Sequence, residues 1–431
     1  MGKDYLLAGQ MQAKAPLVTR SWRSPASLLL IALFVSLPFE TILTGSRNAA
    51  FTMSRGIGLA LGVAFLLTPR LWRAGRGWAL GLFVANLVIA ALSVGFSLKV
   101  GFLASGQLVQ EGLTLCQLCI VFWIASSLLK RGELAAIAWR GFYLSCGVLA
   151  GLNWFGMFKT EEVIFGHRES ALGQDPNYFA GTLAIGLLTM WHDYLALRMR
   201  RRTGAGAPYA MAVGGLSILM ASAIIRTGSR NAVLGVLLGA TVIAVSSGKR
   251  ISKTKKILMV TGLACAGWWA VSQGSILEER FKWLEQFHAS EARYDIYPIA
   301  IEMVREKPLL GWGVASARWE LGTRLGHDGM VEAHNLILGS LIDNGFIGSL
   351  PLMLAIIICA RQAWLARETS RGQLPISLVA TMLLMNMFVS WYYMKLFWLI
   401  MAYAWSSDVG LVGTESRHVR QIVAGQPSRL P

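Results

Sequence analysis

Charged residues are scarce in this chain. Asp, Glu, Lys and Arg make up 15% of its 431 residues, whereas hydrophobic residues make up 55%, and the mean hydropathy is +0.52. A soluble domain typically carries about 25% charged residues, so this chain has too few to cover a water-exposed surface. The shortage argues against a soluble enzyme, a secreted disulfide-stabilised domain and a disordered protein.

Acidic residues and cysteines are also few. The 23 Asp and Glu face 40 Lys and Arg, which gives a formal net charge of +17. Such an excess is typical of nucleic-acid-binding proteins, but polytopic membrane proteins also gather Lys and Arg in their cytoplasmic loops. The five cysteines fall within apolar segments. Cys116 and Cys119 have metal or redox spacing, but no histidine or second pair accompanies them, so we interpret all five as packing residues.

Long apolar runs are abundant. A helix needs about 20 mostly apolar residues to cross ~30 Å of hydrocarbon. The sequence therefore predicts an all-α fold, a polytopic transmembrane helix bundle with about twelve spans. The predicted spans are 26–43, 53–69, 78–96, 108–129, 134–157, 176–197, 208–225, 231–247, 256–273, 334–360 with a weak point at 343–345, and two within 375–406, broken near 391–395.

The distribution of basic residues predicts the orientation of the bundle. If the loops alternate from a cytoplasmic N-terminus, most Lys and Arg fall on the cytoplasmic side and the outer side is nearly neutral. The positive charge is scattered over short loops, which argues against a nucleic-acid partner. The first span lacks a cleavage site and is expected to be retained. The expected organisation is a cytoplasmic segment 1–25, nine helices in 26–273, an outer loop 274–333, three helices in 334–406 and a cytoplasmic tail 407–431.

The loop 274–333 is long enough to have a structure of its own. Apolar residues recur at helical spacing between Leu277 and Phe287, which predicts an amphipathic helix on the membrane surface or over a cavity. A second helix is expected over 292–305. Such a loop suits a lid or an acceptor platform; a simple packing cap is the alternative.

Three outer-side arginines lie in or next to a repeated sequence. The hexamer Thr-Gly-Ser-Arg-Asn-Ala occurs once with Arg47 and once with Arg230, and Arg226 precedes the second copy. Each places an arginine at a helix N-terminus, where free backbone N–H groups and the helix dipole favour an anion. The guanidinium matches phosphate oxygens. The pattern predicts a phosphate or pyrophosphate site; arginines that merely extend to the water boundary are the alternative.

Two further polar segments flank apolar helices. Asp175 and Asn177 surround Pro176 at the start of the sixth span, where Asp175 is expected to cap the helix; a role of either side chain in substrate binding is a second interpretation. His334 stands where the long loop meets the tenth span, and its imidazole there suits a general base. A histidine without a chemical role is the alternative. No metal-type spacing such as His-Glu-x-x-His accompanies these residues, so no metal is expected.

Four motifs resemble the O-antigen ligase and polymerase superfamily. They are Pro308-Leu-Leu-Gly311-Trp-Gly313, His334-Asn335-Leu-Ile-Leu-Gly-Ser-Leu-Ile-Asp343-Asn-Gly345-Phe-Ile-Gly348, Thr227-Gly-Ser-Arg230 and Asp175-Pro-Asn-Tyr-Phe-Ala180. Asp343 stands where many members have Glu. The resemblance covers roughly 165–350, and the first 150 residues resemble the family in hydropathy alone.

The resemblance implies a glycosyltransferase of the bacterial inner membrane, with its active site facing the periplasm and both termini in the cytoplasm. The donor would be a glycan on undecaprenyl pyrophosphate, and no cofactor is implied. By similarity, His334 would activate the acceptor hydroxyl, while Arg230 and Arg293 would contact the donor pyrophosphate. Arg226 and Arg47 would add to that contact. The expected supporting residues are Asn335, Asp175, Asn177 and His327.

Three functions stay open. A ligase would transfer the glycan to lipid A–core, and this is the function that we favour. A polymerase would extend another lipid-linked repeat and make O-antigen or exopolysaccharide. A transporter or flippase of lipid-linked saccharides also fits about twelve spans, but it would favour charges at the bilayer midplane. Here the ionisable residues gather at the outer boundary and in one long loop, which favours chemistry at the membrane surface.

Overall fold

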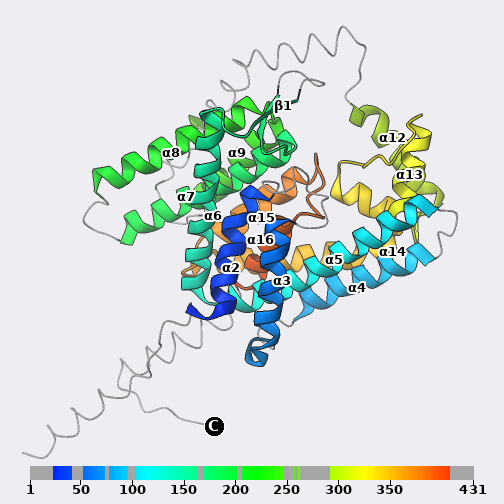
Figure 1. Cartoon of the computed structure of the whole chain (residues 1–431), viewed down its shortest axis with the longest axis horizontal. Helices are drawn as coiled ribbons and strands as arrows, with labels where there is room; N and C mark the ends of the chain where they lie inside the picture. Colours follow the sequence, from blue (N-terminus) through cyan, green and yellow to red (C-terminus); the bar gives the residue numbers. More distant parts are fainter. Residues whose placement is uncertain are drawn as a thin grey trace, which may run out of the picture.

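The computed structural model describes residues 23–40, 52–72, 77–95, 102–162, 168–200, 206–246 and 292–407, with a few positions between 252 and 262. This part of the chain is mostly α-helical, as predicted (Figure 1). It also contains one antiparallel hairpin of β1 (Lys159–Glu162) and β2 (Arg168–Ala171), which the sequence analysis did not foresee.

The helices of the main bundle lie close to the predicted spans. They are α2 (Pro25–Ser36), α3 (Met53–Leu66), α4 (Trp78–Gly95), α5 (Phe102–Leu128), α6 (Gly132–Trp154), α7 (Pro176–Arg200), α8 (Ala207–Arg226), α9 (Arg230–Ser246), α14 (Leu336–Leu365), α15 (Leu374–Met385) and α16 (Lys395–Trp405). The predicted break at 391–395 separates α15 from α16. The predicted span 256–273 lies largely outside the described residues, and the predicted amphipathic helix between Leu277 and Phe287 lies entirely outside them.

Four helical segments in the described part are long and apolar enough to cross a membrane. They are Gln110–Leu128, Gly132–Trp154, Ala207–Arg226 and Leu336–Glu368. Six shorter apolar helices accompany them, among them α9, α15 and α16. The membrane character of the bundle thus agrees with the composition, while the number of twelve spans stays a prediction.

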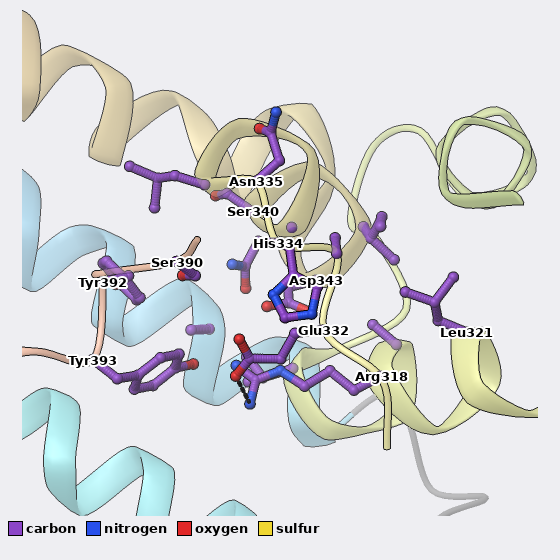
Figure 2. Close-up of a pocket in the computed structure, with 18 of the residues that line it drawn as sticks. Arg318, Leu321, Glu332, His334, Asn335, Ser340, Asp343, Ser390, Tyr392 and Tyr393 are labelled. Carbon is purple, nitrogen blue, oxygen red and sulfur yellow. Dashed lines mark ion pairs between the residues drawn. The ribbon is translucent and has the colours of Figure 1, made fainter. Parts of the chain in front are cut away.

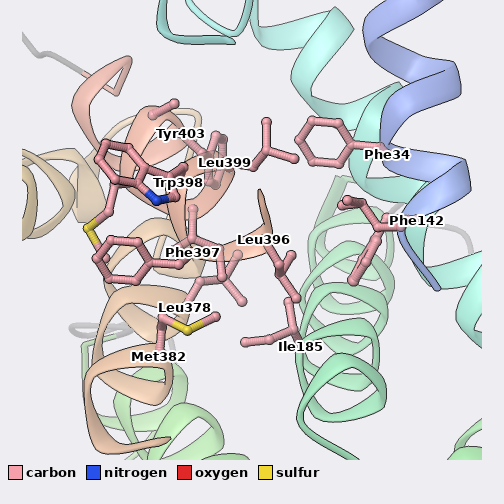
Figure 3. Close-up of a cluster of buried hydrophobic side chains, with 14 of the residues drawn as sticks. Phe34, Phe142, Ile185, Leu378, Met382, Leu396, Phe397, Trp398, Leu399 and Tyr403 are labelled. Atoms are coloured by element: carbon pink, nitrogen blue, oxygen red, sulfur yellow. The ribbon is translucent and has the colours of Figure 1, made fainter. Parts of the chain in front are cut away.

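Helix α16 lies in the centre of the bundle. All of its residues from Leu396 to Ala404 are buried, as expected for a helix that is apolar on every side. Phe34 of α2, Phe142 of α6 and Ile185 of α7 belong to the same core, and Figure 3 shows them facing α16. This core fixes the ends of the helices that carry the polar residues described below.

A second, smaller core lies beside the bundle. It joins α12 (Ala292–Glu306), α13 (Val314–Arg324) and the first turns of α14 through buried residues that include Ile296, Met303, Leu321 and Ile342. The position of α12 agrees with the helix predicted over 292–305. Figure 1 places α12 and α13 together at one end of the molecule, away from α8.

Helix α14 is broken at Gly345, within the predicted weak point. Gly345 has φ +63° and ψ −172°, a conformation essentially restricted to glycine. The break removes helical partners from backbone groups on both sides, and buried groups of this kind need other partners. Residues 308–313 supply them, and we call residues 308–313 together with the break at Gly345 the glycine clasp.

Four backbone hydrogen bonds close the glycine clasp. They run from Trp312 N to Ile342 O (2.8 Å), Gly313 N to Asp343 O (2.8 Å), Phe346 N to Pro308 O (2.7 Å) and Ile347 N to Leu309 O (3.1 Å). The two segments approach so closely that a Cβ on Gly311 would lie 2.6 Å from Gly345 N. The clasp therefore joins the two family motifs and holds the start of α14 against α13.

Candidate functional site

A polar pocket lies where α13 meets α14. It contains about 640 Å³ of empty space, including its opening to solvent. Its polar lining comes from α13, from the segment before α14, from α14 and from the connection between α15 and α16 (Figure 2). These residues are Arg318, Glu332, His334, Asn335, Ser340, Asp343, Asn344, Ser390, Tyr392 and Tyr393.

His334 is held in an unusual backbone conformation. Its φ is +49°, which is uncommon for a residue with a side chain and costs of order 1–3 kcal/mol. Asn335 follows as the N-cap of α14, and its Oδ1 accepts the N–H groups of Ile337 (3.0 Å) and Leu338 (3.1 Å). Figure 2 shows the imidazole directed into the pocket, toward Asp343. The backbone at the start of α14 thus places His334 in the lining of the pocket.

Arg318 of α13 lines this pocket and is surrounded by carboxylates. Its Nη1 lies 2.6 Å from Glu111 of α5 and 3.7 Å from Glu332, and its guanidinium stands 5.0 Å from the ring centre of Tyr393. Burial alone would disfavour its charge, but the surrounding anionic and phenolic groups outweigh burial and raise the pKa of Arg318 above its ordinary value. Arg318 therefore carries a fixed charge that is already paired.

The connection between α15 and α16 forms one wall of the pocket. Asn386 Oδ1 accepts from the backbone N–H of Trp391 (2.9 Å), and its carbonyl accepts from that of Leu336 (2.9 Å), next to His334. The Tyr178 hydroxyl of α7 donates to the carbonyl of Ser390 (2.7 Å). These bonds tie the start of α7 and the start of α14 to the same short segment.

A second polar group surrounds the α8–α9 turn. Arg168 of β2 is 6% exposed, and it donates from Nε to the Thr227 carbonyl (2.9 Å) and from Nη2 to Asn177 Oδ1 (2.9 Å). Asn177 Oδ1 also accepts from the Ser229 hydroxyl (3.1 Å). Arg168 thereby fixes the hairpin to the turn that precedes Arg230, the first residue of α9.

The other predicted residues near this turn have structural partners. Asp175 caps α7, as expected, because its Oδ1 accepts the N–H groups of Asn177 (2.8 Å) and Tyr178 (3.2 Å). Arg226 ends α8; its Nη1 lies 3.4 Å from Glu169 Oε2, and its guanidinium stands 4.2 Å from the ring centre of Trp154. The Arg226 charge is therefore partly compensated by the hairpin.

The structure thus divides the predicted site residues into two groups. His334 and Asn335 line the pocket, whereas Arg226, Arg230, Asp175 and Asn177 lie at the α8–α9 turn and the start of α7. His327 is exposed in the turn after α13 and does not line the pocket. Arg293 belongs to the first turn of α12, with its side chain outside the described part, and Arg47 lies outside the described residues.

The sequence did not indicate that Arg318 and Arg168 belong to these two polar groups. Arg318 occupies one face of an amphipathic helix, and helical spacing does not distinguish it from exposed Arg and Lys. Arg168 lies in a short polar segment that gives no strand signal, and its partner Thr227 is 59 residues away. Within the described residues, no group of three or more His, Cys, Asp and Glu side chains is arranged to hold a metal ion.

The part of the chain that matches a known family includes residues of both groups. Residues 215–353 match the family model described as O-antigen ligase. The matched segment begins within α8 and ends within α14, so it includes Arg226, Arg230, the glycine clasp and His334. The match confirms the resemblance of these motifs to the O-antigen ligase superfamily, and together with the apolar helices it indicates a membrane protein with a domain of a glycosyltransferase-like family. No curated protein matches the chain.

Proposed function

We propose that this protein transfers a glycan from undecaprenyl pyrophosphate to a sugar hydroxyl on the periplasmic face of the bacterial inner membrane, with lipid A–core as the acceptor. The observation that carries the proposal is the placement of His334. It lies within the matched segment 215–353, on a strained backbone, in a polar pocket that opens to solvent. Strained residues of this kind occur preferentially where their side chain is used.

The proposed reaction is a single displacement. The acceptor hydroxyl oxygen attacks the anomeric carbon, and the bond from that carbon to the pyrophosphate oxygen breaks. His334 accepts the hydroxyl proton, and the pyrophosphate leaves on its lipid with the electron pair of the broken bond. Because pyrophosphate is already a good leaving group, a base of near-neutral pKa and fixed positive charge are sufficient. A single displacement inverts the anomeric configuration.

We assign the donor pyrophosphate to the arginines at the α8–α9 turn. Arg230 begins α9, where the free N–H groups and the dipole of the helix N-terminus favour an anion. Arg226 and Arg293 are proposed to assist. Arg47 is added because it has the same place in the first copy of the repeated hexamer as Arg230 has in the second. Arg226 would exchange Glu169 for a phosphate oxygen. Both termini are proposed to face the cytoplasm, so that α12, α13 and the pocket face the periplasm.

Reconstitution with a defined lipid-linked donor tests this function. His334→Ala should lower transfer by about 10²–10⁴-fold, the usual contribution of a general base. His327→Ala is the matched control, because His327 is an exposed histidine of the same segment that does not line the pocket. Full turnover by His334→Ala, or an equal loss in both variants, would remove the base assignment.

The same assay tests the donor side and the acceptor class. Arg230→Ala should weaken donor use more than Arg230→Lys, because lysine keeps the charge but loses the bidentate fork. Transfer that requires lipid A–core supports a ligase. Elongation of the lipid-linked donor without that acceptor indicates a polymerase. A product with retained anomeric configuration by NMR contradicts the single displacement.

A further inference from the structure

We propose that the pocket around His334 selects acceptors by charge: it accepts a neutral or amino sugar and discriminates against an acceptor with a phosphate or carboxylate group beside the reacting hydroxyl. Glu332 is the residue assigned to this discrimination. The inference rests on the proposed transfer reaction and adds the class of acceptor that it uses.

Carboxyl groups outnumber basic side chains at this pocket. Glu332 and Asp343 line it, and Glu111 stands directly behind Arg318 at 2.6 Å. Among the lining residues that the structure describes, Arg318 is the one guanidinium, and the lining includes no lysine. The single guanidinium is thus already paired with two carboxyl groups, those of Glu111 and Glu332.

Arg318 cannot offer that charge to an entering anion without losing its present partners. Its side chain is 15% exposed, with carboxylates at 2.6 and 3.7 Å and the Tyr393 ring beside it. An anionic acceptor would have to displace Glu111 or Glu332 and then lie close to the displaced carboxylate. Such a like-charge contact in a partly desolvated site is costly.

Glu332 is the carboxylate that an entering group meets. Its side chain is 40% exposed, compared with 22% for Glu111, and it directly precedes the segment that carries His334. Figure 2 shows Glu332 between Arg318 and His334, on the side of the pocket where the imidazole points. A charge beside the reacting hydroxyl would therefore lie next to Glu332.

A buried amide gives independent evidence for a neutral, hydroxyl-bearing ligand. Asn344 lines the pocket and is 6% exposed, and its Oδ1 has no hydrogen-bond partner among the described residues. A buried carbonyl oxygen without a partner is costly, and a sugar hydroxyl supplies the missing donor. A phosphate dianion or a carboxylate placed at this oxygen offers acceptors alone, so the group that occupies this position must be a donor such as a hydroxyl.

Two acceptors that differ in one charged group test the inference. The full-length protein is reconstituted with one lipid-linked donor and with oligosaccharides that end in glucose or in glucuronic acid. The wild-type kcat/KM should favour the glucose acceptor by at least tenfold. Glu332→Gln should reduce the preference to within about threefold. Glu320→Gln is the control, because Glu320 lies on α13, the helix of Arg318, and pairs with Arg324 outside the pocket.

The ratio of the two acceptors is the readout, so a general loss of rate in Glu332→Gln does not affect the result. If a variant transfers nothing, direct binding of both oligosaccharides gives the same ratio from their Kd values. Equal use of both acceptors by the wild type, or a preference that Glu332→Gln leaves unchanged, overturns the inference. Absence of transfer by the wild type with a binding preference intact contradicts the proposed function and supports the charge selection.

Discussion

The glycine clasp predicts a large loss of stability for Gly345→Ala. An alanine at φ +63° and ψ −172° costs about 1–3 kcal/mol in backbone strain alone. Its Cβ would also lie 2.3 Å from the backbone carbonyl of Leu309, so one of the two segments must move. Opening the clasp loses backbone hydrogen bonds worth about 0.5–1.5 kcal/mol each. The expected total is about 3–5 kcal/mol.

Amide hydrogen exchange can show where in the structure Gly345→Ala loses stability. If the free energy of local opening falls by about 3 kcal/mol, the exchange rate of the clasp amides rises by about a hundredfold. The amides to follow are those of Trp312, Gly313, Phe346 and Ile347. The unfolding midpoint in detergent, measured with increasing denaturing surfactant, should fall in parallel.

Gly81→Ala is the matched control for this change. Gly81 lies within α4, which packs against α14, and a Cβ at this position would meet no atom within 4 Å. Alanine in such a helical position stabilises by about 0.5–1 kcal/mol. If Gly345→Ala unfolds at the wild-type midpoint and its clasp amides exchange at the wild-type rate, the account of the clasp is wrong.

Two other variants test the hairpin and the pair of helices α12 and α13. Arg168→Ala should destabilise by about 2–4 kcal/mol, because the buried Thr227 carbonyl loses the guanidinium donor and Asn177 Oδ1 keeps only the Ser229 hydroxyl. Arg168→Lys should restore little stability, since an ammonium lacks the fork that reaches both groups. Unfolding midpoints measure both changes, with exposed Arg70→Ala as the control. Hydrogen bonds from Arg324 lower the pKa of Glu306, so the stabilisation by this pair is present above the ordinary glutamate pKa and is lost as the pH falls through the lowered value. Wild type and Glu306→Gln should therefore differ in stability at neutral pH and converge in acid; a constant difference down to about pH 3 contradicts the pairing.

The helices could be predicted from the sequence because their signal is local. Runs of apolar residues predicted α3, α4 and α6 to α9 to within a few residues, whereas the end of α2 and the start of α5 differ from the prediction by seven and six residues. Asn344 and Gly345 marked the break in α14. The hairpin was missed because β1 and β2 are four residues each, polar and charged, and they resemble a loop. The partners that stabilise β2 come from α7 and from the α8–α9 turn, far along the chain.

The site could be predicted only in part, for the same reason. The position of His334 at a helix junction follows from the neighbouring sequence, and so does the capping by Asp175. By contrast, Arg226 and Arg230 look equivalent in sequence, and only the fold brings Glu169 to Arg226 from 57 residues away. Arg318 and Glu111 are 207 residues apart, and no local pattern indicates that they meet.

The proposed reaction makes different demands on the two polar groups. The donor pyrophosphate would bind to the arginines at the α8–α9 turn, whereas activation of a neutral hydroxyl by His334 would benefit from nearby carboxylates, because they favour the protonated imidazole that forms during transfer. The segment between α15 and α16 links the two sides: Tyr178 of α7 donates to Ser390, and its ring lies 5.0 Å from that of Trp391. Asn386 fixes the same segment to the residue after Asn335. A displacement of α7 upon donor binding would therefore act on the wall of the acceptor pocket through direct contacts.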